Sequence, residues 1–117
     1  MTLKFVTESY ILHQVRIMCA NWYYIRYPSV LKDMDVIEYA NCMRDKTSEI
    51  VAQNKLYENV CTIFDKDYSV ETDDKKRHDN RTNDFYEAQK IVFKILDAAD
   101  KKNQLEKDFT DGDVKSD

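Results

Sequence analysis

The chain has 117 residues, of which 43% are hydrophobic and 34% charged, and its formal net charge is −4. This length fits one domain with its own buried core, and the negative charge argues against general binding to nucleic acid, which a basic surface favours. No apolar run approaches the roughly 20 residues that cross a bilayer, and the N-terminus lacks the features of a secretory signal. We therefore expect a cytoplasmic protein, in a cell or in an infected host, with no membrane partner.

The fold class follows from the scarcity of turn formers. The chain contains one glycine and one proline, whereas β-hairpins and sandwiches need glycine-containing turns. The sequence therefore predicts an all-α fold, a small bundle of three to four helices over residues 1–105. An acidic tail over residues 106–117 is expected to be disordered.

The first helix is expected from about Thr7 to Tyr27, where Pro28 ends it, because the residue before a proline is pushed out of helical geometry. On a helical wheel this segment carries two apolar stripes. The broad stripe comprises Ile11, Val15, Met18, Trp22 and Ile25. The narrow stripe comprises Tyr10, Ile17 and Tyr24. Two stripes are typical of a helix between neighbours, so we expect this helix to be central in the bundle.

A second helical segment begins near Asp35, which is spaced from Glu38 as in a capping box. From there a pattern with alternating spacings of four and three comprises Val36, Ala40, Met43, Thr47, Ile50, Asn54, Tyr57, Cys61, Phe64 and Tyr68. This a/d pattern favours one long central helix over residues 36–65, with a break near residues 44–49 as the alternative. It also predicts a homodimer, with packing inside one protomer as the alternative. The expected dimer seam comprises Met43, Thr47, Ile50, Asn54 and Tyr57.

The following segment, residues 65–83, is almost entirely polar and carries charges of both signs, which predicts a long, mobile loop. Asp84 and Glu87 then repeat the capping-box spacing and open a third strong helix. Its apolar residues, which share one face, are Phe85, Ala88, Val92, Ile95, Leu96 and Ala99. The opposite face is charged, so this helix is expected at the surface with one side buried.

The sequence contains no motif of a known catalytic site. A chain with one glycine has no phosphate-binding loop, no nucleophile elbow and no dinucleotide-binding turn. Its three cysteines are widely spaced and indicate neither a disulfide framework nor a zinc site. The His78-Asp79 pair has only His13 as a second imidazole, too few for the metal pair of HD phosphohydrolases. We therefore expect no enzymatic activity, no bound metal and no cofactor.

Two acid pairs keep one enzyme class open. Asp84 and Glu87, and likewise Asp97 and Asp100, are spaced so that both members of a pair lie on one side of a helix. Small all-α nucleotide pyrophosphohydrolases hold Mg²⁺ with paired acids, although they place the pairs on separate facing helices. A metal-dependent domain that binds or hydrolyses nucleotides is therefore the alternative function, and a structural or assembly protein is the second alternative.

The aromatic segment 21–28, NWYYIRYP, suggests a binding surface. Tyr23 and Tyr27 flank Arg16 on the wheel, near the polar strip that holds His13. Two phenols beside a guanidinium have the composition of interface hot spots, and packing under the proline turn is the alternative. The sequence thus favours a non-enzymatic protein-binding module, an adaptor or inhibitor, with Tyr23, Tyr27, Arg16 and His13 as contact residues.

The composition also bears on the kind of partner. Lysine, asparagine, aspartate, isoleucine and tyrosine are abundant beside little glycine, proline and alanine, which is typical of an AT-rich genome. This favours a phage or viral accessory protein that counters a host factor. The identity of that partner protein does not follow from the sequence.

Overall fold

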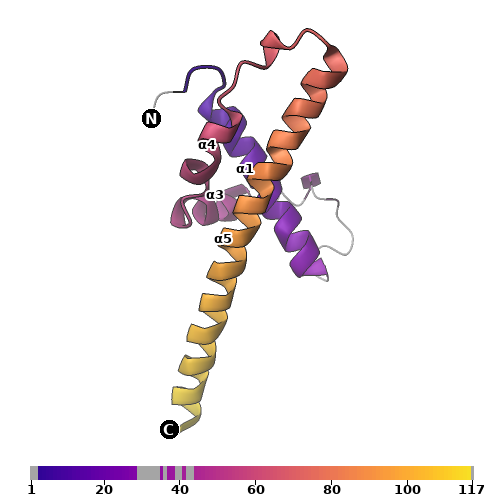
Figure 1. Cartoon of the computed structure of the whole chain (residues 1–117). Helices are drawn as coiled ribbons and strands as arrows, with labels where there is room; N and C mark the ends of the chain where they lie inside the picture. Colours follow the sequence, from indigo (N-terminus) through magenta and orange to yellow (C-terminus); the bar gives the residue numbers. More distant parts are fainter. Residues whose placement is uncertain (1–2, 29–34, 36, 39–40, 42–43, 117) are drawn as a thin grey trace.

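The computed structural model describes residues 3–28, 35, 37–38, 41 and 44–116, and for residues 45 and 104–116 it describes the backbone alone. The elements in this part of the chain are α1 (Glu8–Arg26), α3 (Arg44–Gln53), α4 (Leu56–Phe64), the 3-10 helix η2 (Tyr68–Val70) and α5 (Asp74–Ser116) (Figure 1). No strand occurs among the described residues, so the expected small all-α bundle is confirmed. Within the same residues no helix is both long enough and apolar enough to span a bilayer.

α1 begins and ends where local signals place it. The Thr7 hydroxyl accepts a hydrogen bond from the backbone N–H of Tyr10 at 3.1 Å, which satisfies a donor that the helix itself leaves open. The last helical residue precedes Tyr27, whose φ of −133° is no longer helical, and Pro28 follows. The observed bounds, Glu8–Arg26, therefore lie within one residue of the predicted ones.

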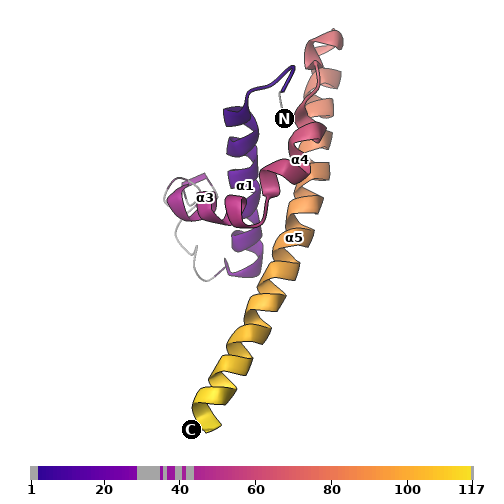
Figure 2. The same cartoon turned by 90° about the vertical axis from the view of Figure 1, so that its left-hand side faces the viewer.

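One hydrophobic core joins α1, α3, α4 and α5. Its buried members are Ile11, Val15, Met18, Cys19 and Trp22 from α1, Val51 from α3, Leu56, Val60, Cys61 and Phe64 from α4, and Ala88, Val92 and Leu96 from α5. α4 packs along α5, and α1 crosses α5 beside them (Figures 1 and 2). Each large apolar side chain of this set stabilises the fold by roughly 1.5 to 3 kcal/mol through its removal from water.

The heptad segment is not one continuous helix. Lys55 separates α3 from α4 and adopts the left-handed conformation with a φ of 52°. One long helix over residues 36–65 is therefore wrong for the described residues. A break was the alternative, but it was expected near residues 44–49 and lies at Lys55 instead. The physical reason is that Val51 and Leu56 are both buried in the core, whereas a continuous helix would point them about 140° apart.

α5 begins at Asp74, inside the segment 65–83 that was expected to be a loop. The Asp73 carboxylate accepts hydrogen bonds from the backbone N–H groups of Lys75 at 2.9 Å and Lys76 at 3.2 Å, which caps the new helix. The loop expectation is therefore wrong for residues 74–83. This stretch is mostly charged, so it was expected to be a loop. Its sequence nevertheless contains a signal for a helix start, the capping acid Asp73.

The C-terminal half of α5 projects beyond the bundle. Figures 1 and 2 show the helix leaving the other elements and continuing alone to its end. Its backbone is helical to Ser116, and no proline interrupts it. The side chains after Asn103 lie outside the described part, so disorder over residues 106–117 stays a prediction.

Candidate functional site

Two of the predicted contact residues pack against the core. Tyr23 and Tyr27 are half-buried, and their ring centroids lie 5.0 and 5.8 Å from that of Trp22. The Tyr27 hydroxyl donates a hydrogen bond to the Asp100 carboxylate, whose two oxygens are 2.9 and 2.8 Å away. Tyr27 thus joins α1 to α5, which corresponds to the packing alternative. Contact of these tyrosines with a partner protein stays a prediction.

The other two predicted contact residues lie in different surroundings. Arg16 is half-buried and lines a hollow of about 240 Å³ together with Leu12 from α1, Val51 from α3 and Tyr57 from α4. Its Nε atom is buried and has no hydrogen-bond partner among the described residues. His13 is exposed to solvent. The four residues therefore do not form one open patch.

The expected dimer seam is used largely inside the protomer. Thr47 is fully buried, and Ile50 and Tyr57 are half-buried against the core. The Asn54 side chain donates a hydrogen bond to the carbonyl of Ile50 at 2.9 Å. Met43 lies outside the described residues. Packing within one chain accounts for these positions, and homodimerisation stays a prediction.

The carboxylate of Asp97 is engaged by two side chains of α1. Arg26 donates from Nε and Nη2 to its two oxygens, both at 3.0 Å, and the Trp22 indole N–H donates at 2.8 Å. The Arg26 hydrogen bonds, followed by the Trp22 hydrogen bond, hold the pKa of Asp97 below its ordinary value. With Tyr27 on Asp100, this acid pair joins α1 to α5. No cluster of three or more potential metal ligands occurs among the described residues.

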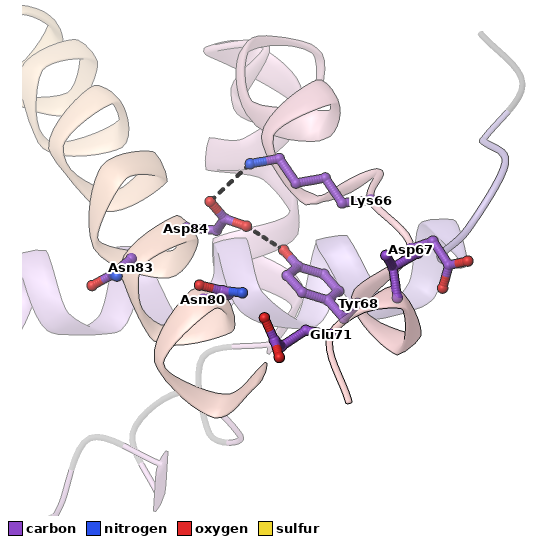
Figure 3. A pocket seen from close by; sticks show the side chains of 8 residues that line it. Lys66, Asp67, Tyr68, Glu71, Asn80, Asn83 and Asp84 are labelled. Atoms are coloured by element: carbon purple, nitrogen blue, oxygen red, sulfur yellow. Dashed lines mark hydrogen bonds and ion pairs between the residues drawn. The ribbon is translucent and has the colours of Figure 1, made fainter. Parts of the chain in front are cut away.

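Asp84, from the other acid pair, is 7% exposed beside a polar hollow of about 530 Å³ (Figure 3). Lys66 pairs with one of its oxygens at 3.0 Å, and the Tyr68 hydroxyl donates to the other at 2.5 Å. Burial, and then the hydrogen bond to Asp84, raise the pKa of Tyr68. Figure 3 shows the Lys66 and Tyr68 side chains pointing toward this carboxylate. The carboxylate therefore fastens the segment before α5 to α5, while its expected pair member, Glu87, is exposed.

Two of the three residues in the narrow apolar stripe of α1 are exposed to solvent. Tyr10 and Tyr24 are 36% and 44% exposed, Ile17 is half-buried, and Ile25 from the broad stripe is 55% exposed. Tyr86 of α5, 56% exposed, lines the same hollow as Tyr10. We call these five residues the exposed face. α1 contacts α3, α4 and α5, as expected of a central helix. These helices pack on the broad stripe and its flanks, however, so among the described residues Tyr10 and Tyr24 of the narrow stripe stay exposed.

A groove runs beside Tyr10 between α1 and α5. Two hollows of about 280 and 240 Å³ share Tyr10 and Arg81. The Arg81 guanidinium lies over the Tyr68 ring, 5.2 Å from its centroid, and Phe85 and His78 belong to the lining. We call this the Tyr10–Arg81 groove. Sequence reasoning missed it, since α1 and α5 bring together residues that no local pattern connects.

Comparison with known proteins identified no relative: no family model, no curated protein and no solved structure matches the chain. The function must therefore be argued from the described residues themselves. Among these, the exposed face and the Tyr10–Arg81 groove combine large apolar side chains with access to solvent, and they form the candidate binding site.

Proposed function

We propose that the protein is a non-enzymatic protein-binding module, an adaptor or inhibitor that occupies a surface of another protein. The exposed face is the observation that carries this proposal. Seven large hydrophobic side chains are exposed in the described part of the chain. Three of them, Tyr10, Tyr24 and Ile25, lie along α1, and a fourth, Tyr86 of α5, lines a hollow with Tyr10. Exposed apolar clusters mark interaction sites in soluble proteins, and tyrosine is enriched among the residues that dominate binding energy.

The use of the acids supports binding over catalysis. Asp84, Asp97 and Asp100 each accept hydrogen bonds from side chains of the protein. A magnesium-dependent nucleotide hydrolase needs carboxylate oxygens that are available to the cation. Here those oxygens hold helices together, so the metal-dependent alternative has less support from the geometry. The composition supports the further proposal that the partner is a host factor countered by a phage or viral protein.

Affinity capture with matched variants tests the proposal. The wild-type chain is used to capture proteins from an extract of the source organism or its host, and co-eluting proteins are identified by mass spectrometry. A Tyr24→Ala/Ile25→Ala variant is expected to lose a specific partner while keeping the helicity and melting temperature of the wild type, because exposed positions contribute little to folding stability. Val70→Ala, a change at a 77% exposed side chain that lines neither hollow of the groove, should keep the partner. Equal capture by both variants would overturn the proposed surface.

Thermal-shift measurements separate this function from the alternative. The wild-type chain is melted with Mg²⁺, with Mn²⁺ and with a panel of nucleotides. A ligand that binds the folded state raises the melting temperature. We expect no shift; a stabilisation that disappears in an Asp97→Asn/Asp100→Asn variant would favour the nucleotide-binding domain instead.

A further inference from the structure

The Tyr10–Arg81 groove differs in charge from the protein as a whole. The chain carries a net charge of −4, yet the positively charged Arg81 lines both hollows of the groove and no carboxylate lines either. Asp84, the buried acid of this part of α5, is already held by Lys66 and by the hydroxyl of Tyr68. The groove is therefore a cationic site on an acidic protein.

Arg81 is oriented without an acidic partner. Its side chain is exposed, and its guanidinium lies over the ring of Tyr68. Stacking on an aromatic ring restrains the guanidinium plane but leaves its N–H edge free to donate hydrogen bonds. Arg26 and Arg77 each form an ion pair with an aspartate, whereas Arg81 forms none with any carboxylate of the described residues. Its donors are thus available to a negatively charged ligand.

The floor of the groove is aromatic. Tyr10 packs edge-to-face on the buried ring of Phe64, with centroids 6.3 Å apart. Phe85 and Tyr86 form a second edge-to-face pair at 5.7 Å. Such rings offer an apolar side chain both contact area and a defined packing geometry. A complementary ligand therefore carries negative charge next to an apolar group.

We infer that the Tyr10–Arg81 groove binds an acidic segment of the partner protein, with a carboxylate paired to Arg81 and an apolar side chain packed against Tyr10 and Phe85. This inference rests on the proposed protein-binding function and names the chemistry of the partner. Carboxylates suit a guanidinium because they accept two parallel hydrogen bonds from it. Nucleic acid also carries anionic oxygens, but its dense charge is repelled by an acidic protein, whereas a short acidic peptide brings only a few charges.

The test measures the affinity of a short fluorescein-labelled peptide of glutamate and serine with one central phenylalanine, by fluorescence anisotropy at low ionic strength. The same peptide with lysine in place of glutamate, and the same peptide with serine in place of phenylalanine, serve as controls. We expect the acidic peptide to bind about tenfold or more tightly than either control, because each control removes one of the two complementary groups. Nuclear magnetic resonance of the labelled amides should place the peptide next to Tyr10 and Arg81.

Protein variants complete the test. Arg81→Glu should weaken binding of the acidic peptide about tenfold or more, while Arg81→Lys, which keeps the charge but lacks the planar fork, should weaken it less. Lys46→Glu is the matched control, since it makes the same change of charge at an exposed position on α3 and should not alter binding. Undetectable binding of the acidic peptide, equal binding by Arg81→Glu, or tighter binding of a single-stranded oligonucleotide would overturn the inference.

The capture experiment distinguishes failure of this inference from failure of the proposed function. If Arg81→Glu still captures the partner that Tyr24→Ala/Ile25→Ala loses, the protein is a binding module whose partner does not use Arg81. If both variants lose the partner, the exposed face and the groove act as one surface. If neither variant loses it, the partner binds through another surface, and both the exposed face and the groove are wrong. If the wild-type chain captures no specific partner, the proposed function itself is wrong.

Discussion

The two apolar stripes of α1 arise from the same helical periodicity but differ in burial: the broad stripe is buried from Ile11 to Trp22, and only Ile25 at its end is exposed. Ile11, Val15 and Met18 of the broad stripe are fully buried, whereas Tyr10 and Tyr24 of the narrow stripe are exposed. The broad stripe is mostly aliphatic, while the narrow stripe carries phenol groups that tolerate water at one end. Periodicity therefore shows which faces are apolar, and the packing of the remaining helices decides which apolar face is covered.

The break at Lys55 contributes to which apolar face of α1 is covered by the other helices. It sets the direction of α3, and the hollow lined by Leu12, Arg16 and Val51 shows that α3 lies on the flank of the broad stripe. Tyr24 is 44% exposed, so no described element covers it as fully as the neighbouring helices cover the buried part of the broad stripe. A turn of one residue thus helps to determine which side of α1 remains available to a partner.

The largest expected effect comes from the buried stripe. Ile11→Ala should lower the free energy of unfolding by about 2 to 5 kcal/mol, because it removes a fully buried side chain and leaves a cavity. Urea denaturation monitored by circular dichroism measures the loss. Ile25→Ala is the matched control, since it makes the same change at an exposed position of the same helix and should cost less than about 0.5 kcal/mol. Similar losses in both variants would show that the two positions do not differ in burial as described.

A smaller effect of opposite sign is expected at the turn that directs α3. Lys55→Gly should raise the free energy of unfolding by up to about 1 kcal/mol, because glycine adopts a positive φ without the steric cost that other residues bear. Chemical denaturation again provides the measurement. Lys46→Gly, inside α3, should instead lower stability by about 1 kcal/mol. A loss of stability in Lys55→Gly would mean that this residue is not in the left-handed conformation.

A pH-dependent effect is expected where Trp22 of the buried stripe meets α5. The hydrogen bonds from Arg26 and then Trp22 hold the pKa of Asp97 below its ordinary value of 3.8. When folding lowers the pKa of a carboxyl group, that group stabilises the folded chain at pH values above the pKa that it has in the unfolded chain. This stabilisation is lost as the pH falls through the lower pKa of the folded chain. The melting temperatures of wild type and Asp97→Asn should therefore differ at neutral pH and converge in acid.

A nuclear magnetic resonance titration of the Asp97 carboxyl carbon provides the direct readout of that effect. The pKa should lie below 3.8 in the wild type and rise in Arg26→Gln, which removes the charged donor. An unchanged Asp97 pKa in Arg26→Gln would show that the ion pair does not form in solution. The difference in melting temperature would then need another cause.

The smallest expected effect lies on the exposed face. Tyr24→Ser should change the free energy of unfolding by less than about 0.5 kcal/mol, because the side chain is already in contact with water. It should also lower the fluorescence of a bound hydrophobic dye, which reports on exposed apolar surface. A loss of about 2 kcal/mol or more would be typical of a buried side chain and would show that the narrow stripe is covered.

Sequence patterns predicted the elements whose signals are local. The apolar periodicity and the Pro28 stop placed α1, and the periodicity around Val92 identified the buried face of α5. The start of α5 was missed although Asp73 carries a capping signal, because the polar surroundings resembled a loop. The break at Lys55 was also misplaced, since a lysine in the left-handed conformation leaves no mark in the a/d pattern.

The candidate site was less predictable than the fold. Wheel geometry grouped Tyr23 and Tyr27 with Arg16, but their exposure depends on where α3 and α5 lie. The sequence revealed the narrow stripe that contains Tyr10, but it predicted that this stripe packs against a neighbouring helix. Nothing near Tyr10 in the chain indicates Arg81, which reaches it only through the crossing of α1 and α5.

The sequence by itself determined the all-α class, the bounds of α1 and the apolar faces of α1 and α5. Turn composition, caps and periodicity act over a few neighbouring residues, so they can be read along the chain. Only the tertiary structure decided that Tyr10 and Tyr24 stay exposed, that Asp97 meets Trp22 and Arg26, and that a cationic groove forms between α1 and α5. These outcomes depend on contacts between residues that are far apart in the chain, and such contacts exist only once the helices have packed.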